Sequence, residues 1–185
     1  MNATTVAEPL TIPAFLAWCE RQERGRYELV GGEVVAMTSE SAAHASAKAQ
    51  IWRALAEAIE QRAASCEAFI GGLGVAVDAR TVYVPDALVN KGERISPDAM
   101  LAPTPVSIVE VLSPSSRHID KSVKLAGYFK LASLAHHLVV DLERHTVLHY
   151  RRQGADEPIL LRIVTEGVIR LDPPGLDLAL SEIFA

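Results

Sequence analysis

The segment 107–112, with the sequence Ser-Ile-Val-Glu-Val-Leu, restricts the fold of this chain more than any other feature. Apolar side chains occupy both of its alternating faces, which is typical of a strand buried on both sides in the interior of a sheet. Glu110 interrupts the apolar run, and a buried carboxylate without a partner costs several kcal/mol. The sequence therefore predicts a covered sheet whose buried strand carries a glutamate that is paired with a cation, protonated or bound to a divalent metal.

Hydrophobic periodicity elsewhere predicts helices and hairpins around this strand. The clearest helix is expected at residues 39–64, which Ser39 or Ser41 can cap. Ile51 and Leu55 recur on one face of it. Other helices are expected at 11–24, 120–132 and 178–184, and hairpins at 27–37, 137–151 and 159–171. About eight strands and three or four helices are expected altogether, so the fold class is α/β or α+β.

The length of 185 residues suits one domain. Residues 1–10 look like a loose N-terminal tail without the features of a signal peptide, and residues 11–185 are expected to form a single domain. No apolar run approaches the roughly 20 residues of a membrane span. The two cysteines, Cys19 and Cys66, show no motif spacing, so we expect reduced thiols and a cytoplasmic protein.

The formal net charge is −5. Proteins that bind nucleic acid without specificity usually carry a basic surplus, because their affinity comes from neutralised phosphates. The acidic balance therefore argues mildly against a strong DNA-binding protein. It does not exclude an enzyme that meets DNA briefly and concentrates acidic groups at a metal site.

Asp86 is the natural partner of Glu110 in a metal site. It follows Pro85 at the end of the β segment 81–84, where strands commonly present residues to a site. The alternative is that Asp86 serves only to form a turn, since Pro-Asp is a common turn dipeptide. Two carboxylates on neighbouring strands are what a hard cation such as Mg²⁺ or Mn²⁺ needs from a protein that also binds a phosphate.

Asp120, Lys124 and Tyr128 are spaced four residues apart, so they share one face of the helix expected at 120–132. In isolation this pattern favours a surface ion pair between Asp120 and Lys124. The functional alternative turns Lys124 towards the metal site. There it would orient the attacking water and offset charge on the phosphoryl group.

Taken in order, several motifs resemble the Uma2 family, also called the domain-of-unknown-function 820 group (DUF820), within the PD-(D/E)XK nuclease superfamily. The resemblance covers about residues 11–152. It rests on Tyr27-Glu28-Leu29-x-x-Gly-Glu, His44 at a helix start, Val84-Pro85-Asp86, Val109-Glu110-Val111-Leu112-Ser113-Pro114-Ser115, and Asp120-x-x-x-Lys124-x-x-x-Tyr128.

The resemblance implies a restriction-endonuclease-like core, in which helices flank a mixed β-sheet and the site lies along one sheet edge. Asp86 and Glu110 match the metal-binding residues of the family, and the carbonyl of Val111 is the implied backbone ligand. The superfamily usually places a lysine two residues after the glutamate, where this chain has Leu112. The family pattern moves the lysine to the next helix, which nominates Lys124, with Lys121 as its rival.

The resemblance also selects Glu28 and His44. Glu28 is implied to be an outer metal ligand or a base that orients water, and its alternative is an ordinary hairpin residue. His44 shares a helical face with Lys48 and Ile51. A lone histidine on such a face is more often a packed residue than a catalyst, so we expect it to support the site without binding the metal.

Together these features predict a Mg²⁺- or Mn²⁺-dependent endonuclease that hydrolyses DNA phosphodiester bonds with metal-activated water. A homodimer would suit cleavage of both strands. The main alternative is a non-catalytic nucleic-acid-binding or regulatory module that keeps the nuclease scaffold. A third interpretation makes Glu110 and Lys124 a structural ion pair.

Overall fold

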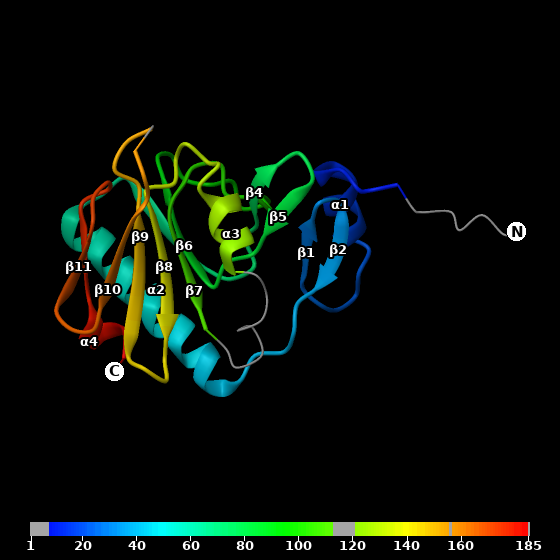
Figure 1. Cartoon of the computed structure of the whole chain (residues 1–185). Helices are drawn as coiled ribbons and strands as arrows, with labels where there is room; N and C mark the ends of the chain where they lie inside the picture. The colour runs from blue at the N-terminus through cyan, green and yellow to red at the C-terminus, as the bar shows by residue number, and fades with distance from the viewer. Residues whose placement is uncertain (1–7, 113–120, 156, 185) are drawn as a thin grey trace, which may run out of the picture.

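The computed structural model describes residues 8–112, 121–155 and 157–184 (Figure 1). Most of the expected N-terminal tail, the Ser-Pro-Ser run after Leu112, and Asp120 lie outside the described residues, and so does the side chain of Lys121.

A six-stranded mixed sheet forms the centre of the fold. Its order is β10 (Leu160–Val164), β9 (Thr146–Arg151), β8 (His136–Asp141), β7 (Pro105–Val111), β6 (Ala87–Lys91) and β3 (Cys66–Ile70). β7 and β8 pair in parallel, and the other neighbours pair antiparallel. Every residue of β7 is buried except Glu110. The prediction of a buried interior strand with one exceptional carboxylate is therefore confirmed.

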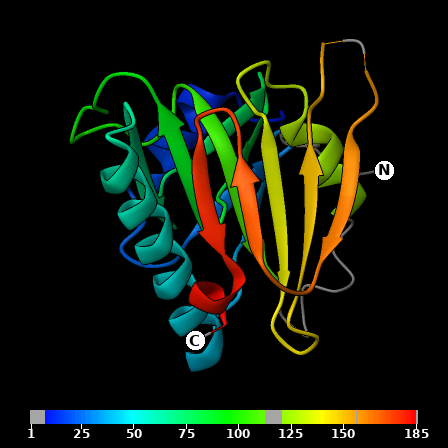
Figure 2. The same cartoon turned by 90° about the vertical axis from the view of Figure 1, so that its left-hand side faces the viewer.

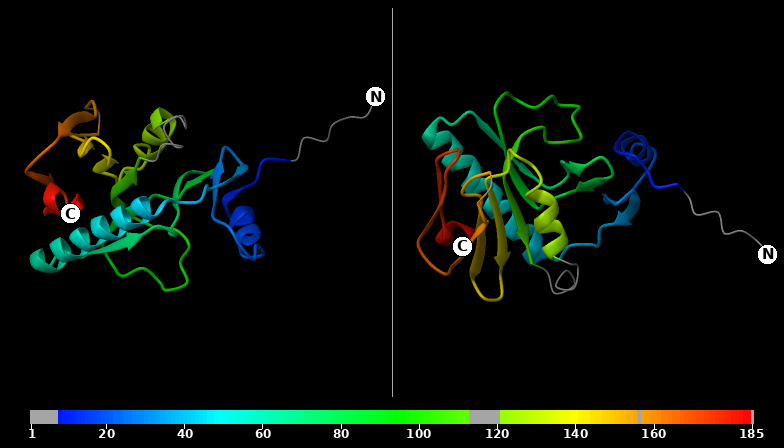
Figure 3. Two further views of the ribbon diagram at one scale, coloured as in Figure 1. Left: turned by 90° about the horizontal axis from the view of Figure 1, so that it is seen from below. Right: turned by 45° about the horizontal axis from the view of Figure 1, so that its top comes forward.

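Helices cover the two faces of this sheet. On one face lie α2 (Ala42–Arg62), the β11–β12 hairpin (Val168–Leu171 and Leu176–Ala179) and the short α4 (Leu180–Ile183), as Figure 2 shows. α3 (Lys121–Tyr128) covers the other face, and the left view of Figure 3 shows the strands passing between α2 and α3. Successive side chains of β7 point to opposite faces of the sheet, so they pack against different helices. Val109 and Val111 pack with α2, whereas Ile108 packs with Tyr128 of α3.

The local sequence explains where α2 begins and ends. The side-chain oxygen of Ser41 accepts a hydrogen bond from the backbone N–H of His44, so Ser41 is the N-cap. The helix ends at Ala63, which adopts a left-handed conformation with φ of 48°. This start places His44 and Lys48 in the first two turns, on the buried side of the helix.

A second, four-stranded sheet has the order β2 (Glu33–Ala36), β1 (Tyr27–Val30), β5 (Thr81–Tyr83) and β4 (Val75–Asp78). α1 (Ile12–Cys19) packs on it through Phe15. In Figure 1 these N-terminal elements lie at the opposite end of the molecule from β10 and β11. β5 runs directly into Asp86 and so connects the two sheets.

The prediction of a hairpin at residues 159–171 is wrong. In the structure β10 pairs with β9, and β11 pairs with β12. The alternation of apolar residues in the sequence locates these strands correctly, but it does not indicate which strand each of them pairs with. Ile169 and Leu171 of β11 are buried against the α2 side of the sheet, which draws β11 away from β10. The described residues also hold twelve strands, more than the eight or so expected, because several are only three or four residues long.

None of the helices in the described residues is long and apolar enough to cross a membrane. Both cysteines are free thiols.

Three buried histidines lie in the central sheet. His136 Nε2 lies 2.9 Å from the carbonyl oxygen of Pro173, so this nitrogen carries the proton, and His136 Nδ1 is left to accept a hydrogen bond from His149 Nε2 at 2.9 Å. His137 is buried between the rings of Tyr128 and Tyr150. Burial lowers the pKa of His136 and His149 to about 4 and that of His137 to about 3.

These histidines predict a loss of stability in mild acid. In the unfolded chain a histidine takes up a proton near pH 6.5, whereas the folded protein resists protonation until lower pH. The free energy of unfolding should therefore fall between about pH 6.5 and 4, by about 1.4 kcal/mol per pH unit for each histidine. Urea denaturation at several pH values measures this slope. A His149→Gln variant should show a shallower slope, and equal slopes in the two proteins would contradict the assignment.

Candidate functional site

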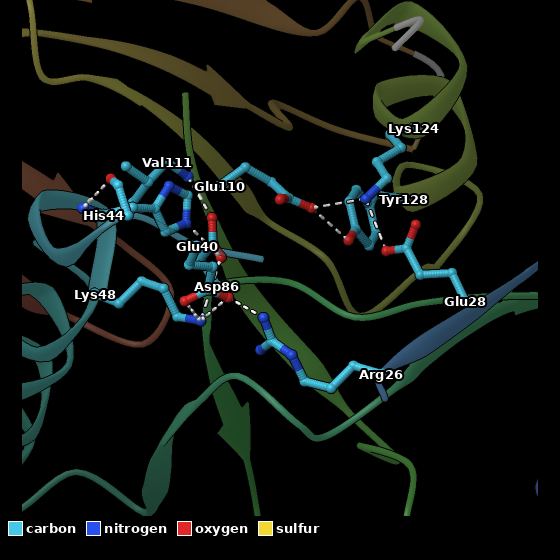
Figure 4. A network of polar contacts seen from close by, with 11 residues as sticks. Arg26, Glu28, Glu40, His44, Lys48, Asp86, Glu110, Val111, Lys124 and Tyr128 are labelled. Carbon is cyan, nitrogen blue, oxygen red and sulfur yellow. Dashed lines mark hydrogen bonds and ion pairs between the residues drawn. The ribbon is translucent and has the colours of Figure 1, made fainter. Parts of the chain in front are cut away.

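The antiparallel pairing of β6 and β7 brings Asp86 and Glu110 to the same end of the central sheet. Ala87 at the start of β6 is opposite Val109 near the end of β7. Asp86 therefore lies beside that end, and its Oδ2 accepts a hydrogen bond of 2.7 Å from the backbone N–H of Val111. The aspartate is thus fixed by the residue that follows Glu110 (Figure 4).

Glu110 points towards α3. The hydroxyl of Tyr128 donates a 2.8 Å hydrogen bond to Glu110 Oε1, and Lys124 Nζ lies 3.7 Å from the same oxygen. Burial raises the pKa of Glu110 to about 7, and the carboxylates of Asp86 and Glu28 add to this rise against the opposing effects of Lys124 and Tyr128. Burial is therefore the main cause of the rise, and Lys124 and Tyr128 only partly oppose it.

Lys124 lies between two carboxylates. Its Nζ donates a 2.8 Å hydrogen bond to Glu28 Oε1, and its side chain is only 21% exposed. Burial lowers the pKa of Lys124, but Glu110 and Glu28 outweigh this and raise it, so the ammonium group is charged at neutral pH. Lys124 is therefore turned to the sheet end and is not an exposed surface group.

Glu28 joins the site from the second sheet. Its Oε1 accepts the hydrogen bond from Lys124 and also a 2.9 Å hydrogen bond from the backbone N–H of Val84. Glu28 is buried in β1, and its role in the site stays a prediction.

A second group of charged residues surrounds Asp86 on the α2 side. His44 Nε2 lies 3.1 Å from Asp86 Oδ1, and Lys48 Nζ lies 3.6 Å from the same oxygen. The hydrogen bond to Asp86 raises the pKa of His44, against the effect of burial. Lys48 Nζ also donates to both oxygens of Glu40, at 2.8 and 3.0 Å, and Arg26 pairs with the same carboxylate.

The sequence interpretation selects His44 but not Arg26, Glu40 or Lys48. One signal is available for Lys48, which lies one turn after His44 on the same face as the buried Ile51. A lysine on a buried face needs a partner. Nothing in the sequence indicates Arg26 and Glu40, because both lie outside helices and strands and reach Lys48 only through side-chain contacts between distant segments.

The donor atoms of the site suit a divalent cation. The set predicted from sequence is Asp86, Glu110 and the carbonyl of Val111. A second set is formed by Glu40, His44 and Asp86, whose ligand atoms all lie within 4.8 Å of one another. Carboxylate oxygens are the ligands that Mg²⁺ and Mn²⁺ prefer. Burial raises the pKa of Glu110, and a cation bound beside this carboxyl group would oppose that rise.

Sequence and structure comparisons show which known proteins this chain is similar to. The sequence model of the Uma2 family, described as "Putative restriction endonuclease", matches residues 12–181. An uncharacterized protein of Synechocystis is 27% identical over 150 residues, which cover 80% of this chain and 84% of the relative. The crystal structure of "a putative nuclease belonging to DUF820" from Anabaena variabilis superposes with a TM-score of 0.74 at 18% identity, covering 95% of this chain and 98% of that one. The predicted restriction-endonuclease-like fold is thereby confirmed.

Proposed function

Because the chain belongs to the Uma2 family, we propose that it is a Mg²⁺- or Mn²⁺-dependent endonuclease that hydrolyses phosphodiester bonds in DNA. The observation that carries this proposal is the arrangement at the end of β6 and β7. There, the backbone N–H of Val111 holds Asp86 next to Glu110, and Lys124 lies 3.7 Å from the Glu110 carboxylate.

In this proposal Asp86, Glu110 and the carbonyl of Val111 hold the cation. A bound divalent cation supplies a nucleophile at neutral pH and offsets negative charge on the phosphoryl group. Lys124 places a second positive charge beside the reacting phosphate, where charge develops in the transition state.

Two further residues position these groups. Glu28 is fixed by the backbone N–H of Val84 and in turn orients the ammonium group of Lys124. His44 donates from Nε2 to Asp86, which sets the direction of the carboxylate that would face the cation.

A plasmid nicking assay tests the proposal. Supercoiled DNA is incubated with the protein in Mg²⁺, in Mn²⁺ and in EDTA, and nicked and linear products are separated by electrophoresis. We expect cleavage with either cation and none in EDTA. Absence of cleavage over a broad range of pH, salt and cation concentration would favour a non-catalytic module that keeps the nuclease scaffold.

A further inference from the structure

Two positively charged side chains, Lys48 and Arg26, hold the carboxylate of Glu40 beside Asp86 (Figure 4). Lys48 reaches both oxygens of Glu40, and the guanidinium group of Arg26 reaches one of them. Lys48 is only 5% exposed, so its charge is held inside the protein. The side chains of Glu40 and Arg26 are 22% and 40% exposed, so solvent reaches both of them.

Glu40 can leave this position without disturbing α2. It lies in the segment between β2 and α2, outside both elements, and the N-cap of the helix is the next residue, Ser41. Departure of Glu40 would leave Lys48 with Asp86 as its nearest carboxylate, at 3.6 Å. Leaving the ammonium group of Lys48 buried with only that more distant partner is unfavourable, so a replacement anion is needed.

The space beside the two cations is kept open by a glycine. A Cβ atom at Gly71 would lie 3.2 Å from Lys48 Nζ and 3.4 Å from Arg26 Nη1. Gly71 also has a φ of +51°, and its backbone N–H donates to the carbonyl of Asp86 at 2.9 Å. The loop therefore follows the Asp86 backbone while presenting no side chain to Lys48 and Arg26.

We propose that Arg26 and Lys48 form a binding site for a phosphate group of the DNA substrate, and that Glu40 occupies this site in the free protein. A carboxylate and a phosphodiester each carry one negative charge and two oxygens that cations can bind together. The exchange therefore conserves charge at the site. Because Lys48 contacts both Glu40 and Asp86, the bound phosphate lies next to the catalytic group. This inference rests on the proposed nuclease function for the identity of the ligand as DNA.

The competing assignment makes Glu40 a cation ligand together with His44 and Asp86. The two assignments predict opposite effects of removing the charge of Glu40. If Glu40 competes with phosphate, DNA binds more tightly to the variant. If Glu40 binds a cation, the variant loses cation affinity and gains nothing in DNA affinity.

The test is fluorescence anisotropy of a labelled DNA duplex in EDTA, over a series of salt concentrations, so that neither cation binding nor cleavage contributes. We expect Glu40→Gln to tighten binding by about threefold to tenfold, because one anion no longer competes with the phosphate. The control is Glu57→Gln, which removes the same charge from an exposed position on α2. It should change affinity far less.

The partner variants complete the design. Arg26→Gln should weaken binding and reduce the slope of log K against log salt by about 0.9, the value for one lost phosphate contact. Lys48→Met should act in the same direction, and Arg26→Gln keeps the test valid if the buried lysine proves essential for folding. In the double variant Glu40→Gln/Arg26→Gln, the gain from Glu40→Gln should be much reduced.

Three results would overturn the inference. These are weaker binding by Glu40→Gln, a gain no larger than that of Glu57→Gln, or no DNA binding by any of the proteins at low salt. The nuclease function is tested separately by plasmid nicking. A protein that shows the Glu40 effect but never cleaves would retain the phosphate site and lose the catalytic proposal.

Discussion

Replacing Asp86 with Asn or Glu110 with Gln is expected to reduce DNA cleavage by about a thousandfold or more. Each change removes one of the two negative charges that would hold the cation, which is worth about 4 kcal/mol of transition-state stabilisation. Both variants keep side-chain size. The amide oxygen introduced by Asp86→Asn would still accept the backbone N–H of Val111, so the fold should persist. Initial rates of plasmid nicking at saturating Mg²⁺ or Mn²⁺ measure the effect.

The matched control for this pair is Asp78→Asn. Asp78 ends β4, and its exposed carboxylate pairs with Lys130, which is not a residue of the proposed site. This variant should cleave like the wild type, and thermal unfolding should show all three variants folded. Cleavage by Asp86→Asn or Glu110→Gln at the wild-type rate would mean that the activity comes from another site or another protein.

Replacing Lys124 with Met is expected to lower the cleavage rate by about a hundredfold to a thousandfold, the cost typical of removing one group that stabilises transition-state charge. The affinity for the cation should stay nearly intact, because the carboxylates remain. Single-turnover rates, together with a Mn²⁺ titration of the same sample, separate the two effects.

Lys130→Met is the control for this substitution, since Lys130 follows α3 and its ammonium group is exposed. It should leave the rate unchanged. A large loss of thermal stability in Lys124→Met, with little change in rate once folding is accounted for, would identify the contacts to Glu28 and Glu110 as a structural ion pair.

The fold is predictable wherever burial leaves a periodic pattern. The two-sided apolar strand at β7 and the capped helix α2 are found in this way. The pairing of β10 and β11 is not, because strand partners are chosen by contacts between distant segments. Ile169 and Leu171 of β11 pack into the core beneath α2, and alternation alone does not reveal that destination.

The candidate site divides in a similar way. Glu110 is conspicuous because it interrupts a buried apolar strand. Asp86 and Lys124 are selected only through the order of motifs that resembles the Uma2 family. The structure places His44 in contact with Asp86, and Lys124 in contact with Glu110 and Glu28. The catalytic roles of Glu28, His44 and Lys124 stay predictions. Arg26, Glu40 and Lys48 are not selected, because the sequence does not show that these three side chains come together beside Asp86.

The most direct measurement is a calorimetric titration of Mn²⁺ at pH 8, above the pKa of Glu110, into wild-type protein and four variants: Asp86→Asn, Glu110→Gln, Glu40→Gln and His44→Gln. If Asp86 and Glu110 together hold the cation, either of their variants loses at least about tenfold in affinity, since each removes a charged ligand. Glu40→Gln then stays close to wild type, and His44→Gln loses less than either carboxylate variant, because His44 orients Asp86 without binding the cation. Unchanged affinity in Glu110→Gln, with loss in Glu40→Gln and His44→Gln, would contradict this and move the cation to the α2 side of Asp86.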